Sequence, residues 1–209
     1  MKNDFAFFGT DDFSVTVLEE LKKAGLLPVL IITAPDRPQG RGLTLTPPPA
    51  KVWAKKNKIK LFQPEKLERE FSIILQSMRV KCFVVASYGK ILPKVMLEIP
   101  EKGALNLHPS LLPHYRGATP IESQILADEK EVGVTVIVMD ERMDHGPIVA
   151  QRKIETKSRK IFAEEGGKLL AEVIPRWIAG EIKPAPQNET KATYTKKLEK
   201  KDGEINLAE

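Results

Sequence analysis

An asparagine and a histidine two residues apart are the strongest chemical signal in this sequence. They are Asn106 and His108, followed at once by Pro109. The apolar run from Ala104 to Leu107 predicts a short parallel strand, so residues 106 and 108 should point to the same side at its C-terminal end. The amide can hold a developing oxyanion and the imidazole can move a proton. Together these two groups suit acyl transfer to an amine.

A carboxylate is needed to orient the imidazole and balance its charge. Asp144 lies in the turn Met143-Asp144-His145-Gly146-Pro147 and can approach the same sheet end, as can Asp140. Ordinary turn chemistry explains an aspartate there equally well. A structural histidine is the alternative for His108, but all three histidines (His108, His114 and His145) fall in this one part of the chain.

Short apolar runs that end at turn residues alternate with helical patterns along the first two thirds of the chain. This βαβα alternation predicts an α/β fold with a Rossmann-like, doubly wound and mostly parallel sheet. The expected strands are 5–8, 29–32, 82–86 and 104–107, and the expected helices are 14–24, 50–57, 71–78 and 119–127. Ser14 or Asp12 is the expected N-cap of the first helix.

The last third contains a predicted strand pair, a long helix and a polar end. Residues 132–139 should pair with 148–154 across the Asp144 turn, and 159–179 should form a helix whose apolar stripe packs on the core. We expect a catalytic domain over 1–180 and a short C-terminal extension, a linker or wrapping tail, over 181–209.

The composition is that of an ordinary globular protein with a localised basic segment. The 209 residues are 42% hydrophobic and 29% charged, with one cysteine and a net charge of +5. Residues 35–60 hold seven basic side chains against one acid, which suits a phosphate backbone or, alternatively, a solvated helix face. With no membrane-length apolar run, no export signal and no Cys-rich cluster, we expect a cytoplasmic protein without a metal site or a membrane partner.

Common nucleotide-binding and hydrolase motifs are absent. The sequence has no G-x-G-x-x-G, no Walker A loop, no H-E-x-x-H and no G-x-S-x-G. The fold class alone therefore does not assign a function.

The residues around Asn106 resemble the ten-formyltetrahydrofolate-dependent formyltransferases. Asn106, His108 and Asp144 match that family's catalytic triad, and Ser110-Leu111-Leu112-Pro113 with Tyr115-Arg116-Gly117 matches its S-L-L-P…R-G segment. The segments 8–13, 33–42, 62–64 and 85–93 resemble the branch of the family that formylates initiator methionyl-tRNA. The resemblance covers essentially the whole chain.

This resemblance implies a transferase of one-carbon metabolism that acts in translation initiation. It implies that Asn106 polarises the formyl carbonyl, His108 shuttles protons and Asp144 holds the histidine. For the folate co-substrate it implies contacts from Tyr88, Gly89, Ile91, Leu92, Ser110, Leu111, Leu112, Pro113 and Asp140. For the tRNA substrate it implies Thr10, Arg37, Arg41, Arg116 and Gly117, and we expect a monomer.

One departure and two alternatives accompany the resemblance. The tRNA-specific relatives continue into a C-terminal barrel-like domain, whereas this sequence ends at Glu209. A formyltransferase acting on a small amine, such as an amino-sugar nucleotide, fits the short length but gives no reason for the basic Gly-rich loop. A catalytically silent RNA-binding relative is the other alternative, and the intact triad argues against it.

Overall fold

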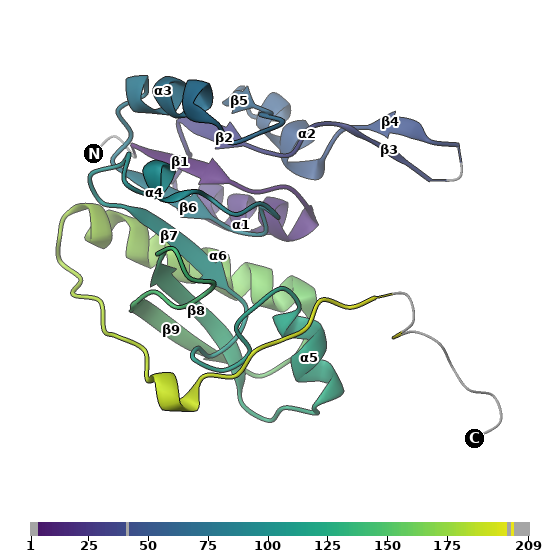
Figure 1. Cartoon of the computed structure of the whole chain (residues 1–209), viewed down its shortest axis with the longest axis vertical. Coiled ribbons are helices and arrows are strands. Elements are labelled where there is room, and N and C mark those ends of the chain that lie inside the picture. The colour runs from purple at the N-terminus through teal and green to yellow at the C-terminus, as the bar shows by residue number, and fades with distance from the viewer. Residues whose placement is uncertain (1–3, 41, 200–201, 203–209) are drawn as a thin grey trace.

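A seven-stranded sheet forms the centre of the computed structural model, which describes residues 4–40, 42–199 and 202 (Figure 1). The strand order is β5-β2-β1-β6-β7-β8-β9. The pairs from β5 to β7 are parallel, and β8 and β9 add antiparallel strands at one edge. The predicted Rossmann-like, mostly parallel sheet is confirmed. Its strands are β1 (Phe5–Phe8), β2 (Leu30–Ile32), β5 (Lys60–Phe62), β6 (Cys82–Val85), β7 (Ala104–His108), β8 (Val132–Val138) and β9 (Ile148–Ile154).

Helices cover both faces of this sheet because alternate residues of its central strands point in opposite directions. Phe5 and Phe7 of β1 belong to one apolar cluster, and Ala6 and Phe8 belong to another. The first cluster packs under α1 (Asp12–Lys23), α2 (Pro49–Lys56) and α6 (Arg159–Ile178), and the second under α3 (Arg69–Ser77) and α4 (Lys94–Leu97). The central strands are therefore buried on both faces, which explains their continuous apolar runs.

The first helix begins earlier than its apolar spacing predicts. Its N-cap is Asp11, whose Oδ1 accepts a hydrogen bond from the Ser14 backbone N–H at 3.2 Å. The expectation of Ser14 or Asp12 as cap is wrong because the Ser14 hydroxyl is buried and donates to the Ala86 carbonyl at 2.7 Å. Ser14 thus joins α1 to the end of β6.

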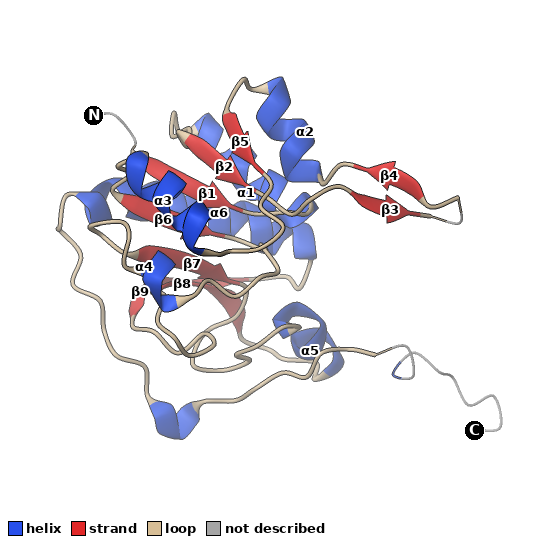
Figure 2. Cartoon of the chain, turned by 45° about the horizontal axis from the view of Figure 1, so that its top comes forward, coloured by secondary structure: helices blue, strands red, loops and turns tan. Residues whose placement is uncertain are grey.

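A two-stranded hairpin that the sequence pattern did not predict extends from the sheet domain. It consists of β3 (Arg37–Gln39) and β4 (Thr44–Thr46) and lies within the basic segment (Figure 2). The strands β3, β4 and β5 and the four-residue α4 are too short to produce a readable periodicity.

The C-terminal part returns across the sheet edge to the loops at the end of β7. After α6, the chain forms a short 3₁₀ turn at Glu189–Lys191 and passes close to α5 (Pro120–Leu126), as the yellow trace in Figure 1 shows. Ala185 exchanges two backbone hydrogen bonds with Ile148 at 2.7 and 2.8 Å. No helix within the described ranges has the length and apolar character needed to span a membrane.

Candidate active site

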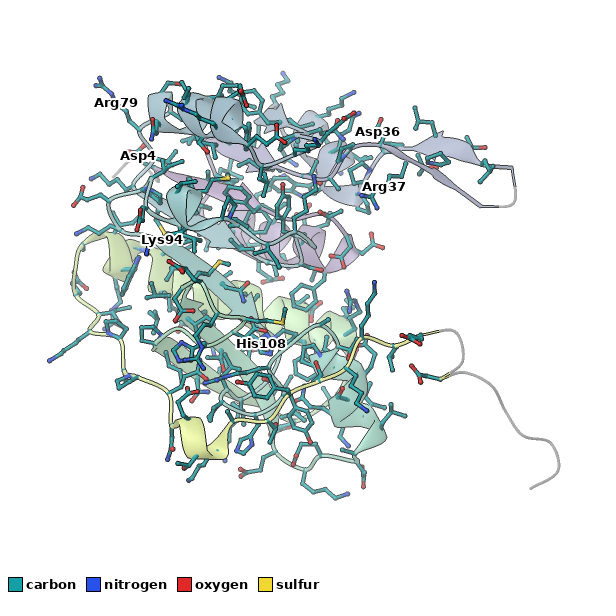
Figure 3. The ribbon with its side chains drawn as sticks, viewed as in Figure 1. Asp4, Asp36, Arg37, Arg79, Lys94 and His108 are labelled. Atoms are coloured by element: carbon teal, nitrogen blue, oxygen red, sulfur yellow. The ribbon has the colours of Figure 1, made fainter. Side chains whose placement is uncertain are left out.

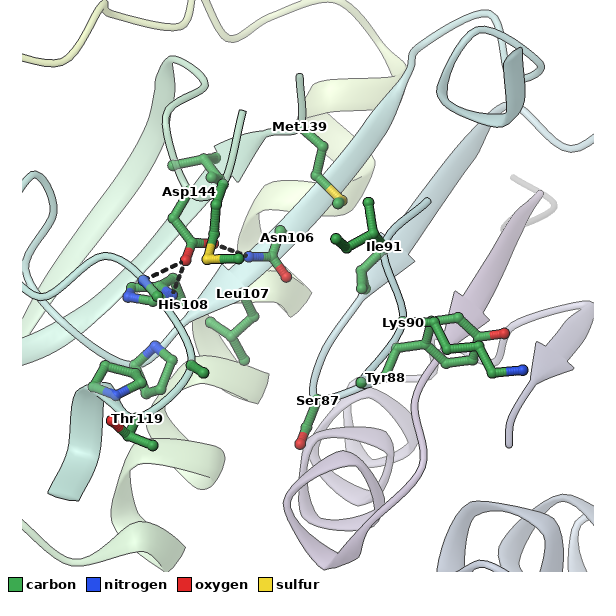
Figure 4. A pocket seen from close by; sticks show the side chains of 18 of the residues that line it. Ser87, Tyr88, Lys90, Ile91, Asn106, Leu107, His108, Thr119, Met139 and Asp144 are labelled. Atoms are coloured by element: carbon green, nitrogen blue, oxygen red, sulfur yellow. Dashed lines mark hydrogen bonds and ion pairs between the residues drawn. The ribbon is translucent and has the colours of Figure 1, made fainter. Parts of the chain in front are cut away.

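The predicted pair at the end of β7 lies in a pocket of about 500 Å³. Asn106 and His108 both line it, together with residues from the loops after β6 and β8 (Figure 4). The position follows from the topology, because the carboxyl ends of β1, β6 and β7 meet at one edge of the parallel part of the sheet. The expectation that residues 106 and 108 share one side is met.

Asp144 joins the two β7 residues to a third segment. Its Oδ1 accepts a hydrogen bond from Asn106 Nδ2 at 3.3 Å, and its Oδ2 accepts one from the Gly117 backbone N–H at 2.8 Å. The same Oδ2 lies 3.5 Å from His108 Nδ1. The structure therefore brings together the amide, imidazole and carboxylate that the sequence proposed as a triad.

The second ring nitrogen of His108 is held by the backbone. His108 Nε2 lies 2.8 Å from the carbonyl oxygen of Tyr115, which can only accept a hydrogen bond. The Nε2 atom therefore carries a proton, and Nδ1 is left to exchange one. The His108 side chain is buried, and its ring lies between the Tyr115 carbonyl and the Asp144 carboxylate. Figure 4 shows the contact between His108 and Asp144.

The loop after β6 forms one wall of the pocket. Tyr88, Gly89, Ile91 and Leu92 all line it, as the folate prediction requires. Gly89 has φ +78°, a left-handed conformation that favours glycine, so the loop turns sharply away from the strand. Burial raises the pKa of the Tyr88 hydroxyl to about 12.

Asp140 lies on the opposite side of the pocket in the loop after β8. Its Oδ1 accepts a hydrogen bond from the Arg142 backbone N–H at 2.9 Å, and its Oδ2 lies 2.6 Å from His145 Nδ1. Met139, which precedes it, adds an apolar surface to the same wall. Asp140 is thus fixed at the pocket surface, where the sequence analysis placed a folate contact.

The segment 110–113 lies behind the catalytic residues and does not line the pocket. Ser110 is fully buried and its hydroxyl donates to the His114 carbonyl at 2.6 Å. Leu112 is also buried, and its N–H donates to Thr135 Oγ1 at 3.1 Å. The folate contacts expected of Ser110, Leu111, Leu112 and Pro113 stay a prediction. These residues pack and hydrogen-bond to support the turn that follows them.

Arg116, which the sequence analysis expected to bind substrate, has partners within the protein. Its side chain is fully buried, with the guanidinium hydrogen-bonded to Gln187, Glu189 and Tyr194, and it does not line the pocket. The donors of Arg116 are thus used within the protein in this structure, and its substrate contact stays a prediction. The neighbouring Gly117 does line the pocket, and its backbone N–H donates to Asp144 Oδ2.

A second, smaller cavity connects the catalytic pocket region to the basic hairpin. Thr10, Arg37 and Lys90 line it, and Tyr88, Gly89 and Lys90 line both cavities. The Lys90 ammonium donates to the Pro64 and Glu65 carbonyls at 2.8 Å, and burial followed by the nearby Arg37 charge lowers its pKa. Arg37 lies at the base of the hairpin (Figure 3), and Arg41 falls outside the described residues.

Arg159 is a pocket residue that the sequence analysis missed. It begins α6, lines the pocket and donates from Nη2 to Asp11 Oδ2 at 2.7 Å. Ser87 donates to the same Asp11 oxygen at 2.8 Å. These contacts join segments 148 and 76 residues apart, so no local sequence signal could reveal them.

Sequence comparison identifies the family independently of this geometry. The formyl transferase family model matches residues 1–169. The methionyl-tRNA formyltransferase of Chloroflexus aurantiacus is 44% identical over 209 residues, covering 96% of this chain and 67% of that protein. The enzyme of the same name from Bacillus velezensis is 41% identical over 211 residues, covering 97% and 66%. The chain thus spans about two thirds of the length of these relatives.

Solved structures with the same fold include formyltransferases of small amines. The N-formyltransferase from Helicobacter canadensis, in complex with folinic acid and dTDP-3-aminofucose, has a TM-score of 0.66 at 21% identity and covers 92% of this chain and 70% of its own. Glycinamide ribonucleotide transformylase 1 from Symbiobacterium toebii has a TM-score of 0.68 at 16% identity, with coverages of 87% and 92%. At these identities the likeness concerns the fold. The family match over residues 1–169 and the 44% identity to a methionyl-tRNA formyltransferase show that the chain belongs to the formyl transferase family.

Proposed function

We propose that this formyltransferase transfers the formyl group of ten-formyltetrahydrofolate to the α-amine of methionine on initiator tRNA. The observation that carries the proposal is the assembly of Asn106, His108 and Asp144 at one end of a pocket whose other side leads to the basic hairpin. An acyl-transfer centre beside a cationic arm suits an amine carried on a nucleic acid.

The pocket residues fit a folate as the formyl donor. Leu92 and Met139 provide apolar surfaces on its two walls, and Asp140 provides a carboxylate that can accept hydrogen bonds. Such a mostly apolar cavity with a few fixed polar groups is typical of small-molecule sites. In this proposal Tyr88, Gly89, Ile91, Leu92 and Asp140 hold the folate ring and present its formyl group to Asn106 and His108.

Asn106 stabilises the charge that develops on the formyl oxygen. The amine nitrogen attacks the formyl carbon, and the carbonyl electron pair moves onto oxygen. One N–H of the Asn106 amide is held by Asp144, and the other is available to donate to that oxygen. A donor of this type is worth about 3 to 4 kcal/mol in the transition state.

His108 moves the proton that this attack releases. With Nε2 bound to the Tyr115 carbonyl, Nδ1 takes the proton from the attacking nitrogen, and Asp144 stabilises the resulting imidazolium. The tetrahedral intermediate then collapses, the bond from carbon to the folate nitrogen breaks, and His108 returns the proton to that nitrogen. The products are the formamide of the acceptor and tetrahydrofolate.

The basic hairpin favours tRNA as the carrier of the amine. Residues 35–60 are strongly basic, and Arg37 has no acidic partner among the described residues, whereas Lys51 pairs with Asp36 at 2.7 Å. A free cation at the edge of the acceptor cavity suits a phosphate contact. A small-amine acceptor remains the second candidate, because the solved neighbours include sugar formyltransferases. We further propose that the enzyme acts as a monomer in the cytoplasm.

The test is formyl transfer from ten-formyltetrahydrofolate to methionine-charged initiator tRNA, with an amino-sugar nucleotide as a parallel acceptor. We expect transfer to the tRNA and none to the sugar nucleotide. Transfer to the sugar nucleotide alone would assign the protein to the small-amine enzymes. No transfer to either acceptor, with folate still bound, would favour the RNA-binding alternative.

A further inference from the structure

We propose that Gln187 and the ion pair between Arg116 and Glu189 are positioning residues for the catalytic triad, through which the C-terminal segment 185–195 holds two catalytic turns together. The two turns are 113–117, which contacts His108 and Asp144, and 140–147, which carries Asp144. This inference rests on the proposed chemistry, but one of its readouts does not depend on the acceptor.

Gln187 uses its whole side-chain amide to join the two turns. Its Nε2 donates to the carbonyl oxygens of Asp144 and Gly146, both at 2.8 Å. Its Oε1 accepts from Arg116 Nη2 at 2.7 Å and from Nε at 3.1 Å. Gln187, which lies outside both turns, thus links the backbone of the Asp144 turn to the Arg116 side chain of the other turn.

The Arg116 guanidinium is held from the other side by a two-pronged ion pair. Nη2 donates to Glu189 Oε1 at 2.6 Å and Nη1 donates to Oε2 at 3.1 Å, and Nη1 also reaches the Tyr194 hydroxyl at 3.1 Å. The arginine hydrogen bond lowers the pKa of the Glu189 carboxyl, which keeps this partner ionised. A fully buried arginine needs such pairing, because an isolated buried charge is strongly unfavourable.

Backbone hydrogen bonds also join turn 113–117 to the segment 185–195. Arg116 N–H donates to the Thr193 carbonyl at 2.9 Å, and Thr195 N–H donates to the Arg116 carbonyl at 2.7 Å. Tyr115 N–H donates to Thr193 Oγ1 at 2.8 Å. The Tyr115 carbonyl that binds His108 Nε2 therefore belongs to a peptide fixed by this segment on both sides.

Both turns contain a non-glycine residue in a left-handed conformation. Tyr115 has φ +61° and Asp144 has φ +50°. Such conformations cost about 1 kcal/mol or more and persist only where the surrounding structure imposes them. Gln187 donates to the Asp144 carbonyl, and Thr193 Oγ1 accepts from the Tyr115 backbone N–H. The segment 185–195 thus holds the strained backbone on which the His108 and Asp144 contacts depend.

The experiment compares Gln187→Ala with Asn188→Ala in the full chain. Asn188 is a matched control, because its amide oxygen accepts only from Thr190 in the described structure and contacts neither turn. Gln187→Glu is a second variant that keeps an acceptor for Arg116 but loses both donors to the Asp144 turn. Far-UV circular dichroism confirms that each variant is folded.

Two readouts separate positioning from a general loss of stability. Turnover should fall roughly tenfold or more in Gln187→Ala and Gln187→Glu, with the folate KM within about twofold of wild type, since small displacements of a catalytic group have effects of this size. Nitrogen-15 spectra of the imidazoles should show His108 ring resonances that differ from those of wild type.

Asn188→Ala should match wild type in both readouts. The proposal is overturned if folded Gln187→Ala turns over as Asn188→Ala does, or if its His108 resonances are those of wild type. If wild type shows no formyl transfer, the proposed function fails, but the His108 spectra still support or overturn the positioning role.

Discussion

Asp144 divides its carboxylate between the two β7 residues and the neighbouring turn. Oδ1 receives the Asn106 amide, while Oδ2 receives the Gly117 N–H and faces His108 Nδ1. The carboxylate therefore fixes the amide that binds the oxyanion and balances the charge of a protonated His108. Its distances to Asn106 and His108, 3.3 and 3.5 Å, are at the long end of polar contacts and leave room for tightening when substrates bind.

Replacing His108 or Asp144 should lower turnover without preventing folate binding. We expect His108→Ala and Asp144→Ala to lower turnover by about a hundredfold to ten-thousandfold, because the first removes the proton carrier and the second removes the carboxylate that stabilises its protonated form. Folate affinity, measured by fluorescence or calorimetry, should change little, since the apolar walls come from the loops after β6 and β8. His114→Ala is the matched control at an exposed position. Normal turnover in either active-site variant would contradict the mechanism.

The catalytic pair could be predicted from sequence because its geometry is local. Asn106 and His108 belong to one strand, and strand periodicity alone places them on one side. Arg116 could not be placed this way, since its partners Gln187 and Glu189 are 71 and 73 residues away. Its motif position predicted a substrate contact, whereas the fold uses the same guanidinium to hold the C-terminal segment.

At the scale of elements, long buried strands and helices were predictable and short exposed ones were not. β1, β6, β8 and α6 have continuous apolar runs or stripes that are read directly from the sequence. The hairpin of β3 and β4 has three-residue strands whose described side chains are largely exposed, so burial does not select them. The sequence did reveal the excess of basic side chains in residues 35–60, because net charge can be counted without knowing the secondary structure.

The hairpin should contribute electrostatic contacts to the acceptor and none to the folate. We expect Arg37→Gln to raise the KM for charged initiator tRNA several-fold and to reduce the slope of log KM against log salt concentration by about one, as for the loss of one phosphate contact. Steady-state kinetics over a range of salt concentrations measures this, with the folate KM as a second readout. Arg41→Ala tests the adjacent predicted contact in the same assay.

Arg79→Gln is the matched control for this charge change. Arg79 is exposed at the end of α3 and lies far from Arg37 in Figure 3. It removes the same unit of charge from the molecule without altering the hairpin. Equal salt slopes for Arg37→Gln and Arg79→Gln would mean that only net charge matters and that the hairpin makes no tRNA contact.

At the scale of the whole molecule, the single cysteine reports on the integrity of the sheet. Cys82 begins β6 between β1 and β7, and its side chain is fully buried. Burial raises the pKa of the thiol to about 12, so at pH 8 roughly one molecule in ten thousand carries the reactive thiolate. Because the strand lies in the centre of the sheet, a reagent reaches this sulfur only when the sheet separates.

Labelling of Cys82 with a thiol reagent should therefore follow global unfolding. Under native conditions at pH 8 we expect almost no reaction, and in denaturant one thiol per chain should react at the rate of a free cysteine. Across a urea titration, the labelling transition should coincide with the loss of far-UV circular dichroism, as a two-state unit requires. Labelling well before that loss would show that β6 opens in a local step, and the sheet would then not be one cooperative unit.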